Sequence, residues 1–168
     1  NDALSKAMNI PELTRLLNKK LNEKTYEIIM SNDSKEKADK ELKEYFKTTV
    51  HYKNLSEEQL DKKVSNLYSS YFRQLLLFDP QDYLPKINCK VLAINGAKDV
   101  QVTSKENLEG IAKGLSHNQK ATLKEYPNLN HLFQPATTGL HTEYGEIETT
   151  IEPVVLDDMV KWLNENVK

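Results

Sequence analysis

The chain has 168 residues, of which 38% are hydrophobic and 29% are charged. This length supports one domain with its own core, and the composition is that of a rather polar, soluble chain. A formal net charge of −2 argues against a nucleic-acid-binding protein, which usually carries a basic surface. No apolar stretch approaches the ~20 residues of a membrane span, so we expect no transmembrane segment.

Cys89 is the only cysteine, which excludes an internal disulfide. It lies in an apolar run, and we therefore expect a buried, unreactive thiol. The chain starts at Asn1 with neither a signal peptide nor an initiator methionine, as expected of a piece cut from something longer. The sequence therefore assigns no compartment.

Residues 1–80 are expected to be helical, because they contain no glycine and are rich in lysine, glutamate and leucine. Pro11 suits the first turn of a helix running to about residue 21. Asp33 or Ser34 is well placed to cap a second helix.

The segment 56–78 is predicted to form one long amphipathic helix that begins at a Ser56 capping box. Apolar and aromatic residues recur along it at helical spacing and form a wide stripe that is expected to face a core. The members of this stripe are Leu60, Val64, Leu67, Tyr68, Tyr71, Phe72 and Leu75.

The pattern changes near residue 80, where two prolines and two aspartates mark a domain boundary. Residues 89–94 form a short apolar run typical of a buried parallel strand. Residues 121–126 alternate weakly and predict a second strand.

Two helices complete the second half of the chain. Thr103 begins a predicted capping box and helix between the strands, and Pro153 begins a terminal helix. Residues 81–168 thus predict a β-α-β-α arrangement with parallel strands, an α/β fold. The expected buried faces contain Leu108, Ile111, Ala112 and Leu115 in the first helix, and Val155, Met159, Trp162 and Leu163 in the second.

Asp99 and His131 are the candidate catalytic residues, because each follows one of the predicted strands. Parallel strands end at the same sheet edge, so the two side chains are expected to approach to about 2.6–3.2 Å. An acid followed by a histidine is the order of the last two triad members in α/β-hydrolases. The spacing alone leaves open that Asp99 is a turn residue and His131 a surface residue.

Several motifs of the second half recur in order and spacing in one known superfamily. They are Phe78-Asp79-Pro80, the run 91–96 with Asp99 and Val102, the segment 130–134, the segment 143–148, and the Pro153 helix with Trp162. From about residue 77 onward the chain resembles the C-terminal part of α/β-hydrolases. It is most similar to bacterial esterases and peptidase-like hydrolases of the serine aminopeptidase and dienelactone-hydrolase type.

The resemblance implies a C-terminal β-α-β-α portion of an α/β-hydrolase sheet (81–168), preceded by a helical cap (1–80). It implies a carboxylic-ester hydrolase in which Asp99 orients His131, and His131 acts as general base and then general acid. The substrate would be a small acyl ester, and no cofactor or metal is implied. Lys90 departs from the family, which usually has proline before this strand.

The nucleophile of such a triad has no candidate in this chain, because none of its nine serines stands in Gly-x-Ser-x-Gly. We therefore expect the serine outside these residues and no activity from the chain by itself. The free edge of the first strand is expected to recruit either a second copy or the missing N-terminal half of the enzyme. His51, His117 and His141 have no partner at metal-ligand spacing, so no metal site is expected.

Two other classes of function are also compatible with the sequence. One is a helical interaction module that binds a partner through the stripe on residues 56–78. The other is an α/β domain in which Asp99 contacts a small ligand without chemistry. A Gly-x-Ser-x-Gly motif encoded immediately upstream would favour the hydrolase over both.

Overall fold

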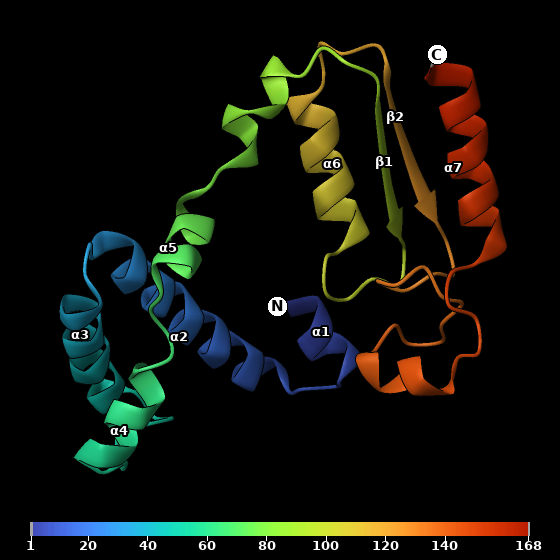
Figure 1. Ribbon diagram of the computed structural model, residues 1–168. Coiled ribbons are helices and arrows are strands. Elements are labelled where there is room, and N and C mark those ends of the chain that lie inside the picture. Colours follow the sequence, from blue (N-terminus) through green and yellow to red (C-terminus); the bar gives the residue numbers. More distant parts are fainter. Residues whose placement is uncertain (1, 168) are drawn as a thin grey trace. The chain divides into compact units, whose positions relative to one another are not determined.

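The computed structural model describes residues 2–167, which form two compact units (Figure 1). A helical unit spans Glu12–Asp79, and a second unit combines the residues up to Pro11 with those from Pro80 onward. The helical unit is therefore inserted in the sequence between two parts of the other. Among residues 2–167, no helix combines the length and apolar character needed to cross a membrane.

The helical unit contains α2 (Glu12–Ser31), α3 (Lys35–Thr48), α4 (Glu57–Val64) and α5 (Ser70–Leu77). Pro11 precedes α2, and this helix runs well beyond the expected end near residue 21. The fully buried core is formed by side chains of α2, α3, α4 and the segment after α4, and Phe72 and Leu76 of α5 pack against it. The buried core residues are Leu21, Ile28, Ile29, Ala38, Leu42, Phe46, Leu60, Val64 and Tyr68.

Local capping explains where two of these helices begin. The Ser34 hydroxyl accepts a hydrogen bond from the Lys37 N–H at the start of α3. Of the two residues expected to cap this helix, Asp33 and Ser34, it is Ser34 that does so. At the start of α4, Ser56 and Gln59 form the predicted capping box, each side chain accepting from the other's backbone N–H.

The prediction of one long helix over residues 56–78 is wrong, because α4 ends at Val64 and α5 begins at Ser70. The Ser69 hydroxyl accepts a hydrogen bond from the Phe72 N–H at 3.0 Å and so caps a new helix. The interruption turns part of the predicted stripe outward, and Tyr71 is exposed.

The second unit is built around a two-stranded sheet. Its elements are α1 (Asp2–Ala7), the short 3-10 helices η1 (Pro80–Asp82) and η2 (Leu84–Lys86), β1 (Val91–Gly96), α6 (Ser104–Gly114), β2 (Ala121–Tyr126), η3 (His141–Glu146) and α7 (Pro153–Asn166). The two strands are parallel, with Val91 opposite Ala121 and Gly96 opposite Tyr126. This is a small α/β arrangement, as the alternation of strands and helices predicts.

Helices cover the two faces of the sheet, α6 on one side and α7 on the other (Figure 1). The Ser104 hydroxyl of α6 donates to the Glu125 carboxylate. On the opposite face, the Trp162 indole N–H of α7 donates to the Thr122 hydroxyl at 3.0 Å. Thr122 and Glu125, an odd number of positions apart on β2, thus point to opposite faces of the sheet, as the alternation of side chains along a strand requires.

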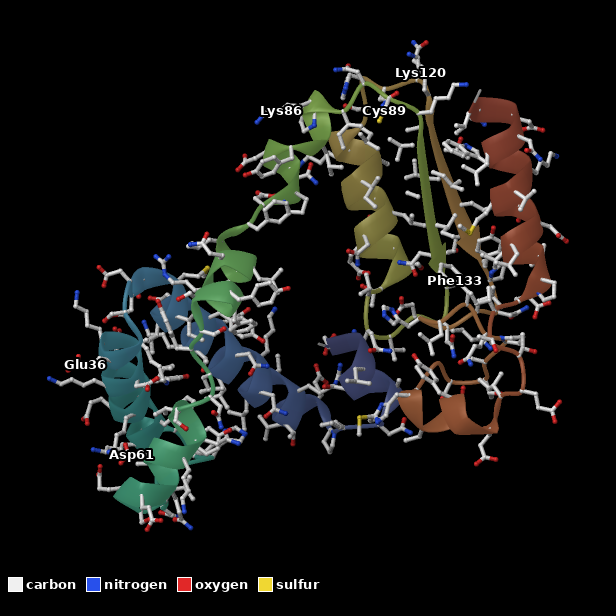
Figure 2. The ribbon with its side chains drawn as sticks, viewed as in Figure 1. Glu36, Asp61, Lys86, Cys89, Lys120 and Phe133 are labelled. Carbon is white, nitrogen blue, oxygen red and sulfur yellow. The ribbon has the colours of Figure 1, made fainter. Side chains whose placement is uncertain are left out.

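Cys89 is exposed, which contradicts the expected buried thiol. Strand β1 starts at Val91, so Cys89 belongs to the connection that precedes it. Figure 2 shows Cys89 and Lys120 where the strands begin, away from Phe133 near their other end. The apolar run in the sequence begins two residues before the paired strand. The expected strand 89–94 is therefore observed as Val91–Gly96.

The helices flanking the sheet depart from the predicted pattern in detail. Thr103 precedes α6, but its side chain makes no capping bond to the helix backbone, so the predicted capping box is absent. Ala112 is exposed on α6, and Met159 and Leu163 are exposed on α7. Met159 and Leu163 line an open hollow beside β1.

Candidate active site

Asp99 and His131 lie in the loops that leave β1 and β2, at the carboxyl ends of the two strands. Asp99 Oδ2 is 2.8 Å from His131 Nδ1, so the predicted approach of the two side chains is confirmed. The Asp99 side chain is 4% exposed, whereas that of His131 is 38% exposed. The acid is thus shielded from water while the imidazole remains accessible.

The hydrogen bond to Asp99 selects one tautomer of a neutral His131 ring. An ionised carboxylate only accepts hydrogen bonds, so Nδ1 donates to Asp99 and Nε2 keeps its lone pair. A histidine fixed in this tautomer presents Nε2 as a proton acceptor. The same arrangement holds the base of serine hydrolases ready to take a hydroxyl proton.

The backbone of its own loop holds Asp99 in place. Oδ1 accepts hydrogen bonds from the N–H groups of Gln101 at 2.9 Å and Val102 at 2.8 Å. The Asn95 amide, on β1, donates to the Val102 carbonyl at 3.1 Å and ties the far end of the loop to the strand. One carboxylate oxygen is therefore committed to the loop, and the other is left for His131.

The loop after β1 that carries Asp99 (the acid loop) and the loop after β2 that carries His131 (the histidine loop) are also joined through their backbones. The Ala97 N–H donates to the Tyr126 carbonyl at 2.9 Å, and the Lys98 N–H donates to the Leu129 carbonyl at 3.0 Å. Gly96 makes this approach possible, because a Cβ atom there would lie 2.2 Å from the Leu129 oxygen. The glycine that ends β1 is thus required by the site, whereas its sequence pattern indicated only a turn.

We expect Gly96→Ala to lower the free energy of unfolding by at least about 2–3 kcal/mol, because the obstructing atoms are backbone and cannot rotate away. Gly145→Ala is the matched control, since a Cβ there meets nothing within 4 Å, and its effect should stay within about 0.5 kcal/mol. Urea unfolding of both variants measures the difference. Equal urea midpoints for the two variants would show that the loops carrying Asp99 and His131 can move apart without loss of stability.

The segment after His131 packs against the acid loop. Lys98 Nζ donates to the Ala136 carbonyl at 2.6 Å, and Gly139, at φ 79°, lies where a Cβ would collide with the Lys98 carbonyl. The Glu143 carboxylate accepts hydrogen bonds from the Thr138 hydroxyl and from the N–H groups of residues 137–139. These bonds, that of the hydroxyl foremost, hold the pKa of Glu143 below its usual value.

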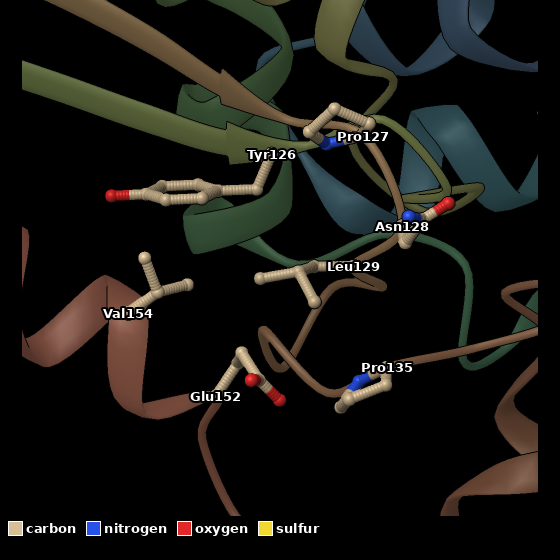
Figure 3. A pocket seen from close by; sticks show the side chains of 7 residues that line it. All are labelled: Tyr126, Pro127, Asn128, Leu129, Pro135, Glu152 and Val154. Carbon is tan, nitrogen blue, oxygen red and sulfur yellow. The ribbon is translucent and has the colours of Figure 1, made fainter.

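A hollow of about 310 Å³ lies behind the histidine loop, between the end of β2 and the start of α7 (Figure 3). It is lined by Tyr126, Pro127, Asn128, Leu129, Pro135, Glu152 and Val154. Asp99 and His131 do not line it. The hollow is therefore separate from the surface on which His131 presents Nε2.

The Asn130 and Gln134 amides belong to the segment 130–134 that carries part of the family resemblance, but the sequence predicted no role for either amide. Both are buried on either side of His131. Their sequence context is otherwise that of an ordinary polar loop.

Metal binding finds no support in the described part of the chain. It contains no group of three or more histidine, cysteine, aspartate or glutamate side chains placed to hold an ion. His117, one of the remaining histidines, instead contacts the Ile87 carbonyl at 3.1 Å. Comparison with protein-family models, with curated proteins and with solved structures found no match for this chain.

Proposed function

We propose that this chain supplies the acid and the base of a serine hydrolase that cleaves carboxylic esters. Asp99 would be the orienting acid and His131 the general base, with the nucleophilic serine contributed by residues outside the chain. The observation that carries the proposal is the 2.8 Å hydrogen bond between a buried carboxylate and an accessible imidazole. The order of acid and histidine after successive parallel strands adds to it.

In the proposed reaction, His131 Nε2 takes the proton of the serine hydroxyl as the serine oxygen bonds to the acyl carbon. The resulting imidazolium is stabilised by Asp99 and then gives its proton to the departing alcohol as the ester C–O bond breaks. Water then releases the acyl group. Nε2 takes a proton from the water as the water oxygen bonds to the acyl carbon, and it gives this proton to the serine oxygen as the bond between that oxygen and the acyl carbon breaks. His131 ends as it began.

The proposal places the chain in the C-terminal part of an α/β-hydrolase sheet, with the helical unit Glu12–Asp79, which makes up most of the expected cap of residues 1–80, as the cap. The position of the helical unit in the sequence supports this assignment, because residues of the α/β unit flank it on both sides. A cap inserted into a catalytic domain has this organisation.

A partner-binding role for the aromatic stripe of residues 56–78 has weaker support. Leu60, Val64 and Tyr68 belong to the buried core of the helical unit and are not available to a partner. Ligand binding by Asp99 without chemistry is also less well supported, because its side chain is buried and both of its oxygens are engaged.

We expect the purified 168-residue chain to hydrolyse a short-chain p-nitrophenyl ester no faster than background. An imidazole and a carboxylate without a serine or an oxyanion hole lack the groups that attack the ester and stabilise its tetrahedral intermediate. The release of p-nitrophenol, with and without a fluorophosphonate inhibitor, measures this. Turnover that the inhibitor abolishes would place the nucleophile within these residues.

The function itself is tested by supplying the serine. The polypeptide encoded upstream of this chain, joined to it or added to it, should restore inhibitor-sensitive ester hydrolysis. Absence of a Gly-x-Ser-x-Gly motif upstream, together with absence of hydrolysis, would contradict the proposal.

A further inference from the structure

Asn130 precedes His131 and is completely buried. Its Oδ1 accepts hydrogen bonds from the Leu132 N–H at 2.9 Å and from the Gln134 N–H at 3.0 Å. Both N–H groups lie beyond His131 in the chain, so the Asn130 side chain spans the turn that carries the imidazole. A buried amide that makes several hydrogen bonds has one rotamer and holds its loop rigidly.

Gln134 braces this amide from the other end of the turn. Asn130 Nδ2 donates to Gln134 Oε1 at 3.0 Å, and the Asn130 N–H donates to the Gln134 carbonyl at 3.0 Å. Gln134 Nε2 in turn donates to the Thr149 carbonyl at 3.1 Å. The turn is therefore anchored to a separate segment of the unit as well as closed upon itself.

The turn also holds a backbone conformation that a bulky residue avoids. Phe133 has φ 57°, in the left-handed region. Its N–H donates to the Asn130 carbonyl at 3.0 Å, and its own carbonyl accepts from the Glu152 N–H at 2.9 Å. Such a conformation costs free energy and persists only where the surroundings fix it, and here those surroundings include the buried amide.

We propose that Asn130, braced by Gln134, is the positioning residue for His131. It fixes the backbone at His131 so that Nδ1 faces Asp99 and Nε2 faces outward. The importance of this positioning for catalysis rests on the proposed function. Its effect on the imidazole does not, because the hydrogen bond to Asp99 lies within this chain.

The experiment is a comparison of the His131 ring in the 168-residue chain by nitrogen-15 NMR, with the His131 signals identified by their loss in His131→Gln. In the unsubstituted chain, neutral His131 should carry its proton on Nδ1, with a downfield proton signal from the bond to Asp99. In Asn130→Ala we expect that signal to be lost and the proton to divide between Nδ1 and Nε2, because the ring is no longer held against the carboxylate.

Asn130→Asp is the conservative variant, because a carboxylate still accepts from both N–H groups. The bond from residue 130 to Gln134 Oε1 is lost in this variant, because the Gln134 NH₂ remains bonded to the Thr149 carbonyl, so the Nδ1 proton signal should return in part. Gln134→Ala leaves Asn130 in place and should give an intermediate loss. A merely structural role for Asn130 would change the unfolding midpoint of these variants and leave the tautomer of His131 unchanged.

Ester hydrolysis separates this inference from the proposed function. With the serine supplied, Asn130→Ala should lower kcat about 100-fold at nearly constant KM, as a misplaced catalytic group does. An unchanged tautomer in folded Asn130→Ala overturns the positioning role. If the tautomer shifts but His131→Ala retains normal turnover, the positioning stands and the hydrolase assignment fails.

Discussion

Asp99→Asn should lower the kcat of the serine-supplemented enzyme about 10⁴-fold, and His131→Ala by a similar or larger factor. KM should change little in both variants, because the two residues act on the transition state and not on substrate binding. The expected losses are the largest that any single substitution in this chain would cause.

The physical reason for the Asp99→Asn effect lies in how its two oxygens are used. The Oδ1 atom accepts from the N–H groups of Gln101 and Val102, so an asparagine would keep its oxygen there. Its NH₂ would then face His131 Nδ1, which must accept and so lose its proton. The proton moves to Nε2, where the base needs a lone pair, although the geometry of the loop is preserved.

His141→Ala is the matched control for His131→Ala. Both histidines are exposed and lie after β2, but the hydrogen bond to the Asp99 carboxylate comes from His131. Steady-state kinetics on a p-nitrophenyl ester should show near-normal turnover for His141→Ala. Near-normal turnover by His131→Ala would instead identify the histidine as a bystander.

The candidate site was predictable from sequence because it depends on simple geometry. Parallel strands deliver the residues that follow them to one edge, so Asp99 and His131 were expected together once the strands were recognised. β2 and the start of α7 were also predicted correctly, because alternation and an N-terminal proline are local signals. In these cases the local preference and the tertiary structure agree.

The features missed by the sequence depend on contacts between distant or competing groups. The break between α4 and α5 was hidden because apolar spacing continued through it, while the Ser69 cap began a new helix. Cys89 was assigned to the core because apolar character does not reveal where strand pairing begins. The role of Gly96 appears only when the histidine loop is placed against it.

The free edge of β1 predicts how the chain behaves alone. β1 pairs with β2 on one side, and no other strand among residues 2–167 pairs with it. Beside it lies an open hollow of about 330 Å³ lined by Lys90, Leu92, Ile94, Met159, Trp162 and Leu163. Unpaired backbone groups next to exposed apolar side chains form a surface to which another chain adds.

We therefore expect the isolated chain to self-associate through β1 and the adjoining face of α7. In the complete hydrolase that we propose, the preceding strand of the sheet would occupy the same edge. Light scattering and sedimentation should show a mass above that of one chain, increasing with concentration. A stable monomer at tens of micromolar would contradict the prediction.

Leu163→Lys locates the interface, because this residue lines the hollow and is 47% exposed. A lysine there loses the burial of a leucine, about 1.5–3 kcal/mol, and so should weaken association at least about tenfold. Val154→Lys is the matched control: Val154 is also 47% exposed, but it lies about 2.5 turns away on α7, on the opposite side of the helix. Equal weakening by the two lysines would show that association depends on the apolar character of α7 in general and not on the edge of β1.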